Sequence, residues 1–190
     1  MNGIEIVATL LGLANIVLLV RRSIWNYPFG LLMVALYAHV FFAAKLYSDA
    51  LLQIFFFAIQ LYGWYAWWRV GGGEHKVRVE RLTGPGRIAW IAMIAFVSFT
   101  WGWAMRSYTD AAYPWWDATI AVASIAAQIL LARRCIENWW LWIAVDLAGI
   151  PLYLTKQLPY TAGLYCLFLL LCVVGLREWI AAERDGRQPA

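Results

Sequence analysis

The sequence predicts an all-helical integral membrane protein with seven transmembrane helices, and three observations support that prediction. Of the 190 residues, 64% are apolar and only 14% are charged, whereas soluble domains contain about 45–50% apolar and about 25% charged residues. A chain this short cannot bury so much apolar surface in a core of its own. The apolar residues also fall into long runs that are separated by short polar segments. We therefore expect one membrane domain over residues 1–190.

Seven apolar runs come near the length of about 20 residues that a bilayer-spanning helix needs. They cover residues 4–20, 28–44, 50–68, 88–105, 116–132, 138–155 and 161–181. The long polar stretch at residues 70–87 has glycines near both ends and several charged side chains, which is typical of a loop. Each run therefore predicts one transmembrane helix.

The basic residues lie mostly on one side of such a seven-span arrangement. That side receives Arg21, Arg22, Arg69, Lys76, Arg78, Arg81, Arg87, Arg133, Arg134, Arg177, Arg184 and Arg187, and the other receives Lys45, Arg106 and Lys156. Because Lys and Arg collect in cytoplasmic loops, we expect the N-terminus outside and the C-terminus in the cytoplasm. The same rule accounts for the net charge of +4 without a nucleic-acid partner.

The two halves of the chain resemble each other when Arg21-Arg22 is aligned with Arg133-Arg134. In this repeat register Asn26 coincides with Asn138, Gly63 with Gly175 and Trp67 with Trp179. This predicts parallel repeats over residues 4–69 and 116–181, with a connector helix over 88–106 in a 3+1+3 arrangement. Transporters built from repeats bind their substrates near the midplane between the repeats. The alternative is that the arginine pairs only mark the cytoplasmic side.

Polar side chains on one face of the third span are the first candidate site. Gln53, Gln60, Trp64 and Trp67 lie at i, i+7, i+11 and i+14, which places them on one helical stripe. Amides within a bilayer are costly and mark substrate pathways, although bonding between helices is the structural alternative. Gln128 in the fifth span is a secondary candidate of the same kind.

The sixth span carries the sharper signal. Trp139, Trp142, Asp146 and Tyr153 follow one stripe at i, i+3, i+7 and i+14. A carboxylate about two turns inside a span must face a cavity, a partner or a ligand; a hydrogen bond to a neighbouring helix is the alternative. Asn138 begins this helix, where Asn also serves as an N-cap. The two indoles suit an aromatic belt as well as an inward face.

Several other functions lack their usual residues. No phosphate-binding GxxxxGK[ST] motif is present, which argues against ATP-driven transport by this chain. The two His and three Cys lack metal-ligand spacing, and no arrangement of catalytic residues suggests an enzyme. We therefore expect no metal, no cofactor and no catalytic site. A retinal-binding receptor would need a lysine in the seventh span, and residues 161–180 contain none.

Several motifs resemble the PnuC family of vitamin transporters. They are WNYPFG at 25–30, KLYSD at 45–49, YGWYAW at 62–67, ENWWLW at 137–142 and LYLTK at 152–156, together with Gln53, Gln60 and Asp146. The resemblance implies a 3+1+3 fold similar to a full-length SWEET transporter, in a bacterial cytoplasmic membrane. It further implies facilitated diffusion of nicotinamide riboside into the cell, where a cytoplasmic kinase traps the riboside by phosphorylation.

The resemblance also implies which residues bind the substrate. Carried onto this chain, they are Gln53, Gln60, Trp64, Asn138, Trp139, Trp142 and Asp146, with Trp67, Gln128 and Tyr153 as secondary candidates. A cationic pyridinium ring suits indole faces and a carboxylate, whereas a mononucleotide phosphate would find no Arg or Lys on these stripes. Thiamine remains the first alternative substrate and riboflavin the second, a non-transporting scaffold remains an alternative function, and a trimer is possible.

Overall fold

A computed structural model of the protein describes residues 3–43, 47–71, 77–109, 113–155 and 159–185. This part of the chain forms seven α-helices. They are α1 (Gly3–Val20), α2 (Asn26–Ala43), α3 (Tyr47–Gly71), α4 (Gly84–Tyr108), α5 (Pro114–Ala132), α6 (Glu137–Thr155) and α7 (Pro159–Asp185). Every predicted span coincides with one helix, and the boundaries agree to within about one helical turn. The all-helical, seven-helix prediction is confirmed. Of the basic residues used to assign the two sides, Lys45, Lys76, Lys156 and Arg187 lie outside the described residues.

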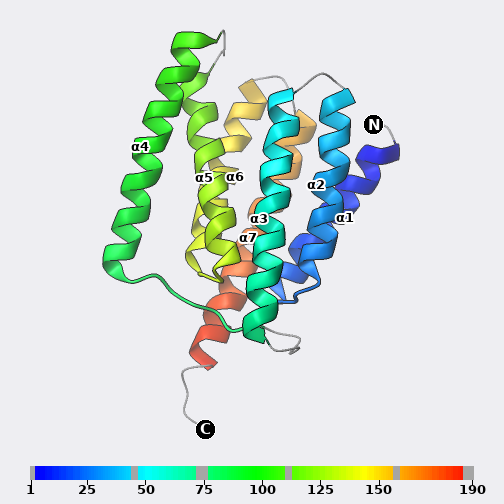
Figure 1. Cartoon of the computed structure of the whole chain (residues 1–190), viewed down its shortest axis with the longest axis vertical. Helices are drawn as coiled ribbons and strands as arrows, with labels where there is room; N and C mark the ends of the chain where they lie inside the picture. Colours follow the sequence, from blue (N-terminus) through cyan, green and yellow to red (C-terminus); the bar gives the residue numbers. More distant parts are fainter. Residues whose placement is uncertain (1–2, 44–46, 72–76, 110–112, 156–158, 186–190) are drawn as a thin grey trace.

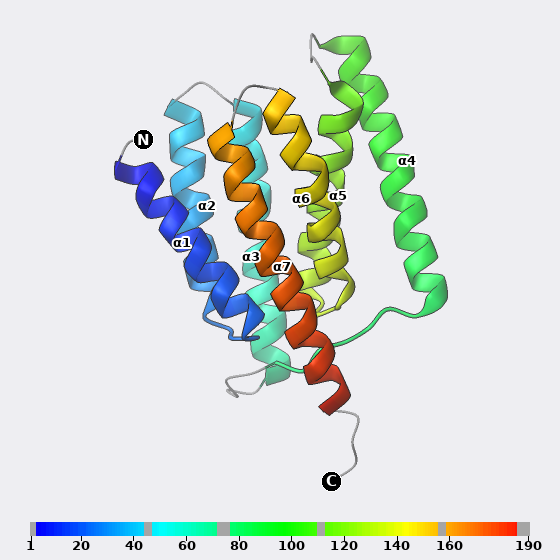
Figure 2. The ribbon, with the colours of Figure 1, turned by 180° about the vertical axis from the view of Figure 1, so that it is seen from behind.

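The contacts between helices join six of them into a closed ring, and α4 lies outside it (Figures 1 and 2). In the first half α2 packs between α1 and α3, and in the second half α6 packs between α5 and α7. The halves meet at two seams, where α3 packs against α5 and α7 packs against α1. Among the described helices, α4 packs against α5 alone. The ring therefore has an interior between the halves to which α4 contributes nothing.

The turns that join α1 to α2 and α5 to α6 have the same backbone conformation. Arg22 (φ 58°) and Arg134 (φ 60°), which the repeat register aligns, both adopt the left-handed region, although this conformation costs a residue with a side chain roughly 1–2 kcal/mol. Each turn is closed by a hydrogen bond to the end of the preceding helix: the Arg22 N–H donates to Leu19 O (2.9 Å) and the Arg134 N–H to Leu131 O (2.8 Å). Both turns lie at the same end of the ring.

Three helices of the described residues are long and apolar enough to cross a bilayer by length and composition alone: α4, α5 and the Ala162–Asp185 part of α7. The others are shorter in their apolar part or carry polar groups. In α6, Asn138, Asp146 and four aromatic side chains lower the mean hydropathy of the helix. Except for Trp140, the α6 residues that lower its hydropathy are also the ones that the sequence singles out as a candidate site.

Candidate functional site

Four large aromatic side chains close one end of the ring. Tyr27, Trp67, Trp139 and Trp179 are each at most 1% exposed and come from α2, α3, α6 and α7. Tyr27 meets Trp67 edge to face at 5.2 Å between ring centroids, and Trp139 meets Trp179 in the same way at 5.6 Å. Trp67 and Trp179 join the two pairs at 6.0 Å. The cluster therefore fills the interior at the end where the arginine-rich turns lie.

Two hydrogen bonds in this cluster cross from one half of the ring to the other. The Trp67 indole N–H on α3 donates to Leu131 O at the end of α5 (3.3 Å), and the Trp179 N–H on α7 donates to Leu19 O at the end of α1 (3.2 Å). The repeat register aligns the two indoles with each other, and it also aligns the two leucines that accept from them. The two seams of the ring are thus fastened by the same interaction, made twice.

Residues 77–83 pass beneath this closed end and contact both turns. The Val77 N–H donates to Arg22 O (3.3 Å), and the Glu80 N–H donates to Arg134 O (2.9 Å). Val77 and Val79 are buried in the core around the aromatic cluster, whereas Arg78, Glu80 and Arg81 are exposed. Burial, reinforced by Glu137 and Glu80, also raises the pKa of the Cys135 thiol at the second turn to about 11. This segment was predicted only as a loop, and its alternating pattern is the signal of its packing.

The carboxylate of Asp146 is buried inside the second half. The buried polar side chains of the described residues are Asn26, Gln60, Ser98, Asn138 and Asp146, and Asp146 is the ionisable one among them. Its Oδ2 accepts a weak hydrogen bond from the Cys172 thiol on α7, at 3.5 Å. Neither Arg nor Lys belongs to the buried residues of the described chain. The carboxylate is therefore placed where a positively charged ligand would be stabilised.

Gln60 occupies a polar cluster inside the first half. Its side-chain oxygen lies directly against Gly30 of α2, and Asn15 of α1 approaches the same glycine. The Asn15 amide donates to Asn26 O at 2.6 Å. A side chain on Gly30 would collide with both amides, so the glycine makes room for them. Three helices thus bring polar groups together at the level of Gln60.

The other end of the ring carries two tyrosines from adjacent helices. The hydroxyls of Tyr153 on α6 and Tyr165 on α7 lie 3.3 Å apart, and the rings lie 4.8 Å apart. Gly149 leaves the space that the Tyr165 ring occupies, since a Cβ there would approach it to 2.7 Å. This pair lies beyond Asp146 along α6 and lines the opposite approach to the interior.

The structure places the predicted site residues in different surroundings. Trp67 and Trp139 are fully buried in the aromatic cluster, and Trp142 packs against its margin. Asp146 and Gln60 are buried in opposite halves, while Gln53, Gln128 and Tyr153 are partly buried and Trp64 is 38% exposed. The Asn138 amide donates to Cys135 O (2.6 Å), as that of Asn26 does to Ser23 O (2.7 Å), so both amides support their turns.

Sequence reasoning did not propose Asn15, Tyr165 or Cys172 as site residues. Asn15 is an amide in the middle of an apolar run, the same criterion that singled out Gln60. The repeat register aligns Gln53 with Tyr165 and Gln60 with Cys172. Applying the repeat to the candidate residues would therefore have found both residues in the second half.

Comparison with known proteins decides the family. The sequence family described as nicotinamide mononucleotide transporters matches residues 2–181. The chain belongs to this family. Its members are membrane transporters, and the resemblance to PnuC that the motifs indicated is confirmed. The all-helical ring is accordingly the fold of a transporter of this family, with Asp146 and Gln60 inside it.

Curated relatives and a solved structure cover nearly the whole chain. The nicotinamide riboside transporter PnuC of Escherichia coli (strain K12) is 30% identical, over 97% of this chain and 88% of the relative. The riboflavin/roseoflavin transporter RibM of Streptomyces davaonensis is 32% identical, over 96% of this chain and 87% of the relative. The crystal structure of the vitamin B3 transporter PnuC matches with a TM-score of 0.79 at 27% identity, over 96% of this chain and 82% of that one.

Proposed function

We propose that this family member takes up nicotinamide riboside by facilitated diffusion, with a substrate site inside the ring between the two halves. The observation that carries the proposal is the buried Asp146 carboxylate, whose hydrogen-bond partner is a thiol. Nicotinamide riboside carries a positive charge on a planar pyridinium ring. A carboxylate in a poorly solvated interior stabilises such a charge more strongly than it would in water.

Trp142 supplies the second element of this site. It precedes Asp146 by one turn of helix, so the two side chains lie on the same face of α6. It packs against the margin of the aromatic cluster and is only partly buried, which leaves part of the indole accessible to a ligand. A cation over an indole face gains about 0.5–2 kcal/mol. Gln60 and Asn15 from the first half would serve the hydroxyl and carboxamide groups of the substrate.

The negative charge of the buried Asp146 carboxylate favours the riboside over the mononucleotide that the family description names. A phosphate group would enter an interior where the buried ionisable side chain among the described residues is an acid. Burying two negative charges together without a cation is unfavourable. We therefore propose that the mononucleotide is rejected.

The aromatic cluster closes one end of the ring, and this closure supports transport by alternating access. We propose that the 3+1+3 repeats rock against each other, and that the crossing indole hydrogen bonds hold the cytoplasmic end shut in the state described. The basic residues that collect on this side place it in the cytoplasm by the positive-inside rule, with the N-terminus outside. The turns and seams that the repeat register pairs support the repeat.

The same proposal implies where this transporter lies in the cell and how its substrate accumulates. We place it in the bacterial cytoplasmic membrane, where its apolar outer faces permit a trimer and a cytoplasmic kinase would phosphorylate the riboside. The phosphorylated product could not return through an interior that rejects phosphate. Accumulation would then need neither ATP hydrolysis nor a coupled ion in this chain.

Riboflavin is the second candidate substrate, because RibM is as similar to this chain as PnuC is. Riboflavin is uncharged, so it would use the aromatic groups and amides but not the charge of Asp146. Thiamine, which is cationic and planar, would use the carboxylate as the riboside does. The three ligands therefore differ in how much they depend on Asp146.

The deciding experiment measures thermal stabilisation of the purified protein by nicotinamide riboside, thiamine, riboflavin and nicotinamide mononucleotide in parallel. A ligand that binds the native state raises its apparent stability by RT ln(1 + [L]/Kd). We expect a shift with the riboside, its loss in Trp142→Ala, and no shift with the mononucleotide. A shift with riboflavin or thiamine alone would change the substrate and keep the site. No shift with any of the four would favour a scaffold.

A further inference from the structure

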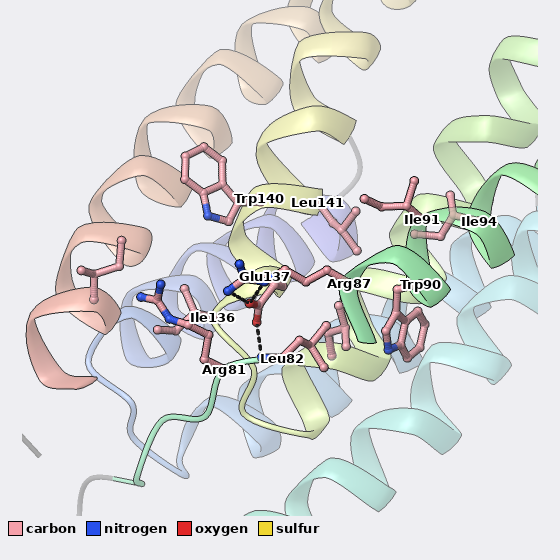
Figure 3. A pocket seen from close by; sticks show the side chains of 12 residues that line it. Arg81, Leu82, Arg87, Trp90, Ile91, Ile94, Ile136, Glu137, Trp140 and Leu141 are labelled. Carbon is pink, nitrogen blue, oxygen red and sulfur yellow. Dashed lines mark hydrogen bonds and ion pairs between the residues drawn. The ribbon is translucent and has the colours of Figure 1, made fainter. Parts of the chain in front are cut away.

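A groove outside the ring remains unused by the proposed transport site. It has a volume of about 360 Å³ and lies between α4, the 77–83 segment and the start of α6, with α5 and α7 contributing one residue each (Figure 3). Its walls are mostly apolar, and they include Ile91 and Ile94 of α4 and Leu141 of α6. The volume falls in the range of roughly 300–1,000 Å³ that is usual for small-molecule sites.

The groove exists because α4 leans away from the bundle. The first turns of α4 stand apart from α5 and α6, whereas its last turns lie beside α5 (Figures 1 and 2), and α5 is the one described helix against which it packs. Ile91 and Trp140, which line this space, are 66% and 58% exposed. In a bilayer, an apolar cleft that opens sideways is filled by hydrocarbon, because water gains nothing from apolar walls.

Charged groups surround the wide end of the groove. Arg87, in the first turn of α4, donates to Glu137 at 2.9 Å, and Arg81 donates to Glu183 at 2.8 Å. The second oxygen of Glu137 accepts the Leu82 N–H at 3.2 Å, as the dashed lines in Figure 3 show. Both oxygens of Glu137 are thus occupied. Each guanidinium has five N–H donors, so N–H donors of Arg81 and Arg87 remain for an anion after these bonds are made.

The balance of charge at this end is positive. Arg81 also lines a second hollow of about 380 Å³, together with Arg133, Arg134 and Glu80. Around the two hollows stand four arginines and three glutamates. Three of the arginines pair with these glutamates (Arg81–Glu183, Arg87–Glu137 and Arg134–Glu80), so the excess positive charge comes from Arg133, which shares the second hollow with Arg81. Arg81 and Arg87 are partly exposed, with side-chain exposures of 38% and 45%. An anion at this position would be received by guanidinium groups that the glutamates already hold in place.

The groove also lies at the depth of a lipid headgroup. A helix of 25 residues such as α4 is about 37 Å long, which exceeds the roughly 30 Å hydrocarbon thickness, so its first turn reaches the headgroup region. Trp90 and Trp140 line the groove, and Trp is enriched at this level of the membrane. Basic pockets between transmembrane helices on the cytoplasmic side are known to take anionic lipid headgroups.

We propose that this groove is a binding site for one anionic phospholipid. The phosphate contacts Arg81 and Arg87, and an acyl chain lies along Ile91, Ile94 and Leu141 between α4 and α6. The lipid fills the space between the first turns of α4 and the start of α6, which the Arg87–Glu137 pair bridges at one end. This site is separate from Asp146 and Gln60, and it does not depend on which vitamin the protein carries.

Native mass spectrometry of the delipidated protein tests the proposal with phosphatidylglycerol and phosphatidylcholine of identical acyl chains. We expect at least tenfold tighter binding of one phosphatidylglycerol molecule. Arg81→Gln, which leaves the Arg87–Glu137 pair intact, and Arg81→Gln/Arg87→Gln should reduce binding to the phosphatidylcholine level. Ile94→Trp, which fills the groove without changing a charge, should remove the same bound molecule.

Two matched controls separate this site from general surface charge. Arg78→Gln changes an exposed arginine of the same segment that does not line the groove, and Ile88→Trp changes an exposed apolar residue of α4 outside it. Both should retain the lipid, and inorganic phosphate alone should not compete with it. Equal binding of the two lipids, or an equal loss in Arg78→Gln, would overturn the proposal. Dimer or trimer peaks whose loss follows Ile94→Trp without any bound lipid would instead assign the groove to a second copy.

Discussion

At the residue scale, the charge of Asp146 can be tested apart from its shape. Asp146→Asn keeps the size of the side chain and a partner for the Cys172 thiol, but removes the negative charge. Charge-assisted interactions are worth about 1.5–3 kcal/mol, so we expect the affinity for nicotinamide riboside to fall roughly 10- to 100-fold. Isothermal titration of the purified variant measures this change.

The control for this variant is Glu178→Gln, which removes an exposed carboxylate of α7 and should leave affinity unchanged. Riboflavin, if it binds at all, should bind the Asp146→Asn protein as well as the original, because it has no charge to lose. Unchanged riboside affinity in Asp146→Asn would show that this carboxylate is only structural.

Glycines at the helix contacts give a second prediction at this scale. A side chain on Gly175 would collide with the Trp139 ring, whereas one on Gly163 in the same helix would meet open space. Overpacking a tight contact costs about 1–3 kcal/mol, so Gly175→Ala should lower the melting temperature. Gly163→Ala should be neutral or slightly stabilising, since Ala favours helix by up to about 1 kcal/mol over Gly. Equal melting temperatures would contradict the close packing.

At the element scale, the crossing indoles determine how firmly α3 is held to α5 and α7 to α1. Trp67→Phe and Trp179→Phe each keep a ring but remove the N–H that reaches Leu131 O or Leu19 O. Each bond is worth about 0.5–1.5 kcal/mol, and hydrogen bonds between membrane helices average about 0.6 kcal/mol. We expect each variant to open the end closed by the aromatic cluster more often and to increase labelling of a cysteine placed at Leu176.

The double variant and an exposed control complete this test. Because both bonds fasten one closure, the two substitutions should be coupled rather than additive. Trp101→Phe on the lipid-facing side of α4, where Trp101 is 53% exposed, should leave labelling unchanged. Equal labelling in all the variants would mean that the indoles contribute to packing but not to the closure.

Element boundaries could be predicted from the sequence, whereas the direction that each side chain faces could not. In a bilayer, residues that face lipid and residues that face the core are both apolar, so hydrophobic periodicity marks a helix but not its inner face. Trp64 and Trp67 lie on one predicted stripe, yet Trp67 is fully buried and Trp64 is 38% exposed. The part of the α3 surface that packs against neighbouring helices is therefore narrower than the predicted stripe.

The proposed repeat predicts paired positions that hydrophobic periodicity cannot, but only in part. Residues that the repeat register aligns occupy paired positions at the turns and in the aromatic cluster. Gln60 and Cys172 also pair by position, yet one lies beside an amide cluster and the other beside Asp146. If the halves are repeats, they share backbone geometry and close packing, while their site side chains are expected to differ because a substrate has no twofold symmetry.

At the scale of the whole molecule, one buried carboxylate in a ring of two halves limits how transport can be driven. Protonation of Asp146 would remove the charge that a cationic substrate needs, so a proton and the riboside would compete for the site. We therefore expect riboside uptake into proteoliposomes to stop when the internal and external concentrations are equal. Enclosing ATP and a riboside kinase should raise total uptake above that level, because the phosphorylated product cannot leave.

Imposed gradients distinguish this mechanism from coupled transport. A pH difference across the membrane should change the initial rate at most, and the final riboside concentration without kinase should be the same with and without a protonophore. A final concentration that follows the pH difference would show that Asp146 exchanges a proton for the substrate in each cycle. The Asp146→Asn protein, which cannot exchange that proton, would then still reach equal concentrations on both sides, and this behaviour would identify the carboxylate as the coupling group.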